Sequence, residues 1–127
     1  MTAADKKLAD SLLAALGQTV WVKSEALIDS VTAVSGSGPA YVFHLVEALT
    51  DAGVKAGLDA KLAAQLARAT VAGAGALLDA DKSAAAELRV AVTSPGGTTE
   101  AALKILMAEL PSLMTRAVDA AKKRAEE

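Results

Sequence analysis

Apolar residues recur every three or four positions through most of the chain, and this spacing is typical of amphipathic helices. The first such stretch follows a possible capping signal at Thr2–Asp5, ends near Gly17, and carries Leu8, Leu12, Leu13 and Leu16. Residues that favour helix starts also precede the later stretches. Together these signals predict helices that begin at Thr2, Ser24, Pro39, Asp59, Ser83, Thr98 or Thr99, and Pro111. The expected fold class is therefore all-α.

One segment departs from the helical spacing. Thr19–Val22 consists of residue types that are enriched in strands, and Gln18 and Lys23 bound it. We therefore expect one short strand near residues 19–22. This strand has no evident partner, because no second strand candidate occurs in the chain.

The helix expected after Asp59 is apolar around most of its circumference. Between Leu62 and Leu78, only Gln65 and Arg68 are strongly polar. A helix of this kind is usually buried on nearly every side. A chain of 127 residues has little left to cover it, so the pattern predicts that a second chain packs against this helix.

Composition and charge exclude several classes of function. The chain has 13 Lys and Arg against 15 Asp and Glu, and they do not form the basic cluster that nucleic-acid binding requires. It has no Cys and a single His, which argues against disulfides and against Cys or multi-His metal sites. No charge-free apolar run is long enough for a membrane span, and the polar N-terminus lacks a secretion signal. We expect a cytoplasmic protein that binds no metal, nucleic acid or membrane.

The stretch Val92–Glu100 carries the clearest chemical signal. Ser94-Pro95-Gly96-Gly97 should stop one helix, and Thr98 or Thr99 should cap the next. Glycines leave backbone N–H groups uncovered, and the positive end of a helix dipole attracts anions. The segment is therefore a candidate site for a carboxylate or a phosphate. The alternative is an ordinary helix stop and restart with a Thr N-cap.

Two other features suggest chemistry only superficially. Ser35–Tyr41 contains Gly36-Ser37-Gly38, but a dinucleotide-binding glycine loop follows a strand, whereas a helix is expected before this one. A tight corner between two helices is the better interpretation. His44 has no obvious carboxylate or nucleophile partner in the sequence, so we expect a partly exposed helix residue rather than a general base.

Several of these segments together resemble one known family. Val31–Phe43 with Ala52–Leu58, and Glu87–Arg89 with Ala91–Thr99, are similar to motifs of the pyrroline-5-carboxylate reductases. The resemblance runs from about Leu8 to near the C-terminus. It implies an all-α, intertwined helical dimerisation domain, similar to the C-terminal domain of 6-phosphogluconate dehydrogenase. The expected partner is thus a second copy of the chain, and dimers of that family also assemble into rings.

The resemblance also implies a domain organisation. Residues 1–23 would be a remnant of the last helix and strand of a Rossmann domain, which in that family binds NADPH or NADH. Residues 24–127 would be the helical dimerisation and substrate-binding domain. This chain would then hold no cofactor itself, and we expect it to be inactive alone.

The resemblance assigns candidate site residues as well. Ser94, Gly97 and Thr98 would bind the substrate carboxylate, and Glu25 would approach the substrate. The Thr99 hydroxyl, the one catalytic candidate, would meet the ring nitrogen when 1-pyrroline-5-carboxylate is reduced to L-proline with NAD(P)H. We expect the chain alone to bind proline-like carboxylates weakly. The alternative is a natural or engineered helical dimer scaffold without a ligand-binding role.

Overall fold

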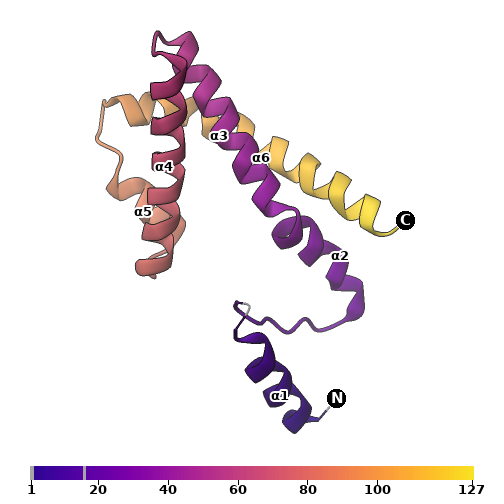
Figure 1. Cartoon of the computed structure of the whole chain (residues 1–127). Helices are drawn as coiled ribbons and strands as arrows, with labels where there is room; N and C mark the ends of the chain where they lie inside the picture. The colour runs from indigo at the N-terminus through magenta and orange to yellow at the C-terminus, as the bar shows by residue number, and fades with distance from the viewer. Residues whose placement is uncertain (1, 16) are drawn as a thin grey trace.

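The computed structural model describes residues 2–15 and 17–127, and its helices confirm the expected all-α class (Figure 1). In chain order they are α1 (Ala3–Leu13), the 3-10 turn η1 (Glu25–Leu27), α2 (Ile28–Val31), the π-helical turn η2 (Thr32–Gly36), α3 (Gly38–Lys55), α4 (Ala60–Ala80), α5 (Ala85–Ala91) and α6 (Thr98–Ala125). None of the described helices is long and apolar enough to cross a membrane.

The first helix begins at the expected capping signal. The Thr2 N–H donates to the Asp5 carboxylate across 2.8 Å, and the Asp5 N–H donates to the Thr2 hydroxyl across 3.2 Å. The hydrogen bond from the Thr2 N–H, and to a smaller extent the one with the Thr2 side chain, holds the pKa of Asp5 below its usual value. The helix ends at Leu13, earlier than the expected stop at Gly17. Leu16, which we placed on the same helix, lies outside the described residues.

Residues 19–22 do not form the strand that we expected, and that prediction was wrong. The segment runs beside α1 instead, where Trp21 Nε1 donates to Asp10 across 2.9 Å and Lys6 Nζ lies 5.2 Å from the centre of the Trp21 ring. A strand exists only as part of a hydrogen-bonded ladder. No other segment of the described chain offers an edge for that ladder, so the β-prone residues stay unpaired.

Small residues allow α3 and α4 to pack closely as a hairpin (Figure 1). Ala63 and Ala67 of α4 are each 2% exposed and face this contact. Gly53 of α3 lies against Ala63, since a Cβ added there would lie 3.2 Å from the Ala63 Cβ. The Asp59 side chain begins α4 as expected, by accepting from the N–H groups of Lys61 and Leu62.

Gly53→Val should lower the stability of the hairpin. The added side chain would collide with Ala63 and with Leu58, and overpacking of this kind costs about 1–3 kcal/mol. Thermal unfolding followed by circular dichroism measures the effect. Ala52→Val places the same side chain on an exposed neighbouring position and serves as the control. Equal melting temperatures for the two variants would contradict a close contact at Gly53.

The last helix, α6, continues for 28 residues and includes Pro111. We predicted that one helix would end before Pro111 and another begin there, and that prediction was wrong. A proline removes only its own N–H from the helical ladder and strains the preceding turn. The bonds on either side maintain the helix, and the Thr115 hydroxyl donates to the Pro111 carbonyl across 2.9 Å.

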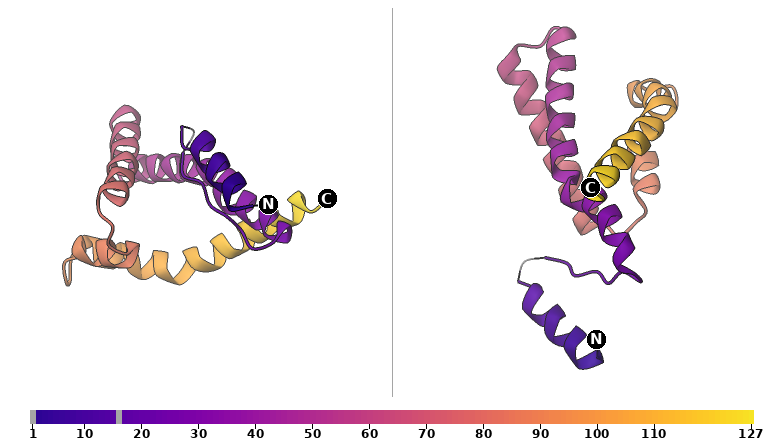
Figure 2. Two further views of the ribbon diagram at one scale, coloured as in Figure 1. Left: turned by 90° about the horizontal axis from the view of Figure 1, so that it is seen from below. Right: turned by 90° about the vertical axis from the view of Figure 1, so that its right-hand side faces the viewer.

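A single copy of the chain has very little core. Among the described residues, only Ala33, Ala63 and Ala67 are buried. The α3–α4 hairpin and α6 diverge from each other, which leaves their apolar side chains uncovered (Figure 2). The chain exposes 10061 Å². A typical folded monomer of 12.8 kDa exposes about 6,300 Å². The excess is therefore roughly 3,800 Å², which is unusual for a protein that folds alone.

Candidate functional site

The loop between α5 and α6 makes a tight turn at Ser94–Gly97. The Gly97 N–H donates to the Ser94 carbonyl across 3.0 Å. Pro95 takes the second position and Gly96, with a φ of 71°, takes the third, which is the pattern of a type II turn. Gly97 has an ordinary φ of −83°, so its backbone conformation does not require glycine, and the constraint there is the space around the residue. A Cβ added at Gly97 would lie 3.0 Å from the Ser94 carbonyl oxygen.

Helix α6 starts directly after this turn. We predicted Thr98 or Thr99 as its N-cap, but the N-cap is Gly97, because the turn already places that residue in an extended conformation. The first backbone bond of the helix runs from the Ala101 N–H to the Gly97 carbonyl, across 3.2 Å. The N–H groups of Thr98, Thr99 and Glu100 therefore have no acceptor among the described residues. Unpaired donors at the positive end of a helix can bind an anion.

The turn brings most of the sequence-predicted site residues together. Ser94, Thr98 and Thr99 are exposed, and their hydroxyl groups have no hydrogen-bond partner in the described part of the chain. Gly97 lies between them, but its N–H already closes the turn. The donors left for a ligand are thus mainly the backbone N–H groups and hydroxyls of Thr98 and Thr99.

Sequence reasoning missed Glu100, which contacts the same turn. Its carboxylate accepts from the Gly96 N–H, and its other oxygen lies 3.5 Å from Lys104 Nζ. An acidic residue at the third position of a helix commonly accepts from the N–H of the N-cap residue. Glu100 occupies this third position but accepts from Gly96, one residue before the Gly97 N-cap. That spacing could have identified Glu100 from the sequence.

The end of α5 supports the turn from the other side. Thr93 donates through its N–H to the Val90 carbonyl across 3.0 Å and through its hydroxyl to the Arg89 carbonyl across 2.6 Å. The Arg89 guanidinium contacts the Met107 sulfur on α6. A cavity of about 240 Å³ lies between the two helices, and Arg89, Thr93, Glu100 and Met107 are among its lining residues. The direction in which the chain enters the turn is thereby fixed.

Glu25, the remaining candidate, lies away from the loop. It is an exposed residue of η1. The following elements, α2 and η2, pack on α6 and lie beside its C-terminal half in all three views (Figures 1 and 2). The loop lies at the opposite end of this helix, which is about 42 Å long at 1.5 Å per residue. One copy of the chain therefore does not bring Glu25 to Ser94–Thr99.

The other two features noted in the sequence have structural roles. Ser35 and Gly36 end the π-helical turn η2, and only Ser37 separates this turn from α3. The Tyr41 hydroxyl donates to the Ala33 carbonyl across 2.9 Å. The segment therefore joins two helical stretches and does not follow a strand, as a dinucleotide-binding loop would. His44 is also exposed as expected, although its Nδ1 lies 2.9 Å from the carboxylate of Glu47. The described residues contain no cluster of acidic, His or Cys side chains that could hold a metal.

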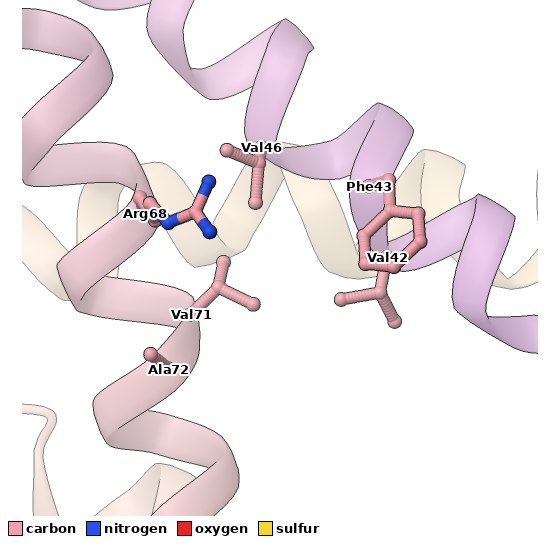
Figure 3. Close-up of a pocket in the computed structure, with 6 residues that line it drawn as sticks. All are labelled: Val42, Phe43, Val46, Arg68, Val71 and Ala72. Carbon is pink, nitrogen blue, oxygen red and sulfur yellow. The ribbon is translucent and has the colours of Figure 1, made fainter.

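A larger hollow lies between α3 and α4, away from the loop. Its volume is about 420 Å³, and Figure 3 shows its lining residues, which are Val42, Phe43, Val46, Arg68, Val71 and Ala72. Phe43, the only Phe of the chain, is a large apolar residue, yet it is 68% exposed. Five of the six residues are apolar, and none is a nucleophile or a usual general base. This groove therefore suits packing against another protein surface better than catalysis.

Comparison with known proteins places this architecture in one family. The family model described as "Pyrroline-5-carboxylate reductase dimerisation" matches residues 25–127. The pyrroline-5-carboxylate reductase of Pseudomonas aeruginosa is 47% identical over 100% of this chain and 47% of its own length. The pea enzyme is 39% identical over 99% of this chain and 46% of its own length. The chain thus spans about half the length of these curated relatives.

Solved structures agree with these relatives. A pyrroline-5-carboxylate reductase from Coxiella burnetii superposes with a TM-score of 0.92, with 42% identity over 99% of this chain and 47% of that one. The Plasmodium falciparum enzyme, solved with NADP bound, superposes with a TM-score of 0.80 and is 32% identical over 98% of this chain and 47% of that one. The resemblance drawn from the sequence motifs is confirmed. The chain belongs to the pyrroline-5-carboxylate reductase family and corresponds to its dimerisation domain.

Proposed function

We propose that two copies of this chain form an intertwined homodimer. The observation that carries the proposal is the excess of roughly 3,800 Å² over the surface of a typical monomer of this mass. Obligate dimer interfaces bury about 2,000–5,000 Å² in total, so the exposed area is sufficient for one. The partner would cover the α3–α4 groove and the apolar side of α4, including Leu66 and Leu77. Assembly of dimers into rings would use other surfaces.

The second part of the proposal concerns the turn at Ser94–Gly97. Together with Thr98 and Thr99 it would bind the carboxylate of a proline-like ligand, with the Thr99 hydroxyl directed at the ring nitrogen. Three unpaired N–H groups at the start of α6 support this role. In the whole protein this would serve the NAD(P)H-dependent reduction of 1-pyrroline-5-carboxylate to L-proline. The nicotinamide cofactor supplies the hydride there, and residues outside 24–127 would hold it.

The same comparison supports the domain boundary that we propose. The family model begins at residue 25, whereas the relatives also align with the preceding residues. We therefore assign residues 1–23 to the end of a cofactor domain and residues 24–127 to the helical domain. The extended segment beside α1 supports this assignment, since its apolar side chains Val20 and Val22 are exposed and its backbone is unpaired.

The separation of Glu25 from the loop connects the two parts of the proposal. Glu25 and Thr99 lie toward opposite ends of α6 in one copy. We infer that a site containing both residues takes Glu25 from the partner subunit. This arrangement would make substrate binding depend on dimerisation.

Titration of the chain with L-proline, followed by NMR, tests the loop. Amide shifts at Gly97, Thr98 and Thr99 should appear with L-proline and not with L-prolinamide, which lacks the carboxylate. Affinity should be low, on the order of millimolar, or about −4 kcal/mol. Thr99→Val removes one hydroxyl and should weaken binding by about 0.5–1.5 kcal/mol. If a dimer shows no shifts at high millimolar L-proline, the chain is a dimer scaffold and its loop is only a helix cap.

A further inference from the structure

A carboxylate of the chain itself already contacts the candidate loop. Glu100 accepts the Gly96 N–H, which is the donor at the left-handed position of the turn. The turn has a second bond, from the Gly97 N–H to the Ser94 carbonyl. The Glu100 bond ties the outside of the turn to the first turn of α6, and no other side chain of the described residues does so. Removal of this carboxylate should therefore loosen Gly96 relative to the helix.

The charge of Glu100 lies close to the donors proposed for the ligand. Glu100 follows Thr98 and Thr99 directly, and all three contribute their N–H groups to the same end of the helix. Its side chain is 38% exposed, so solvent screens the charge only in part. Lys104 lies 3.5 Å away but is 75% exposed, and an exposed ion pair of this kind offsets little of the charge.

We propose that Glu100 positions the Ser94–Gly97 turn and at the same time limits its affinity for carboxylates. This inference rests on the proposed function of the loop. The bond to Gly96 holds the turn against the first turn of α6, where the free N–H groups of Thr98 and Thr99 lie. The negative charge opposes a second carboxylate at those groups, because two like charges a few ångströms apart repel. Glu100 is thus a positioning and specificity residue that need not touch the substrate.

Two substitutions separate these roles. Glu100→Gln keeps an oxygen that can accept the Gly96 N–H but removes the charge. Glu100→Ala removes both. Glu109→Gln makes the same change of charge further along α6, on an exposed residue, and serves as the matched control.

Amide hydrogen exchange measures the positioning role without any ligand. In Glu100→Ala the Gly96 amide should exchange about tenfold faster than in the wild type, as expected when one hydrogen bond is lost. In Glu100→Gln and Glu109→Gln its exchange should stay close to the wild-type rate. Equal Gly96 exchange in all four proteins would overturn the positioning role.

Titration with L-proline measures the effect of the charge. Glu100→Gln should bind L-proline about three- to tenfold more tightly than the wild type, while Glu109→Gln should not differ from it. Wild-type binding that Glu100→Gln does not improve would overturn the inference and leave the proposed carboxylate site standing. Binding by Glu100→Gln alone would support the inference. If no variant binds, the carboxylate site itself fails, and the limiting role of Glu100 fails with it.

Discussion

Leu66→Lys should convert the protein from a dimer into a destabilised monomer. Leu66 is 47% exposed in a single copy, on a helix that has apolar residues on nearly every side. Burial of one Leu side chain contributes roughly 1.5–3 kcal/mol to association. In a symmetric dimer the substitution is present in both subunits, so this contribution is lost twice. The introduced ammonium group would also have to be desolvated if the interface closed over it. The dimer dissociation constant should therefore rise at least about 100-fold.

Light scattering after size exclusion, at several protein concentrations, measures this change directly. The wild type should keep the mass of a dimer, and its melting temperature should increase with concentration, since association stabilises only the folded state. Leu12→Lys is the matched control, because Leu12 lies on α1, is 69% exposed and is outside the family model. A Leu66→Lys protein that remains dimeric, with the melting behaviour of the wild type, would show that this side of α4 faces solvent.

The helices could be predicted from the sequence because their signals are local. The Thr2–Asp5 capping signal and the Asp59 N-cap both mark observed helix starts. The apolar circumference of α4 indicated a missing partner, and the exposed Leu66 and Leu77 agree with that interpretation. These inferences needed only the chemistry of residues a few positions apart.

The errors occurred where a local signal was not sufficient. Thr19–Val22 has the side chains of a strand, but a strand also requires a neighbouring edge, which the described chain does not supply. Pro111 has the chemistry of a helix start, yet an established helix on both sides tolerates the loss of one backbone bond. The conformations at Thr19–Val22 and at Pro111 both depend on the neighbouring structure, and the spacing of residue types contains no information about it.

In the candidate site, too, local features could be predicted from the sequence, whereas a feature that depends on tertiary packing could not. Ser94, Gly97, Thr98 and Thr99 are close in sequence, so their proximity could be predicted, although the type II turn and the N-cap at Gly97 required the backbone conformation. The separation of Glu25 from them could not be predicted, because it results from the length of α6 and from the packing of α2 and η2 on its far half. The family resemblance named Glu25 without saying which copy supplies it.

Gly97→Val should abolish L-proline binding and disturb the start of α6, whereas Gly96→Asn should have a small effect. The two adjacent glycines are needed for different reasons. Gly96 has a φ of 71° and open space around its Cβ position, and Asn tolerates that region of backbone conformation better than most residues. At Gly97 the backbone conformation is ordinary, but a Cβ would lie 3.0 Å from the Ser94 carbonyl oxygen.

That oxygen cannot move away at low cost, because it accepts the Gly97 N–H that closes the turn. A branched side chain at Gly97 should therefore open the turn at a cost of about 1–3 kcal/mol and misdirect the N–H groups of Thr98 and Thr99. The measurement is the L-proline titration by NMR, with light scattering to confirm that both variants remain dimers. Because the Gly97 contact is with the backbone and the groove lies elsewhere, dimerisation should be unchanged in both. Binding by Gly97→Val at the wild-type level, or a greater loss in Gly96→Asn than in Gly97→Val, would contradict the role given to this contact in holding the carboxylate site.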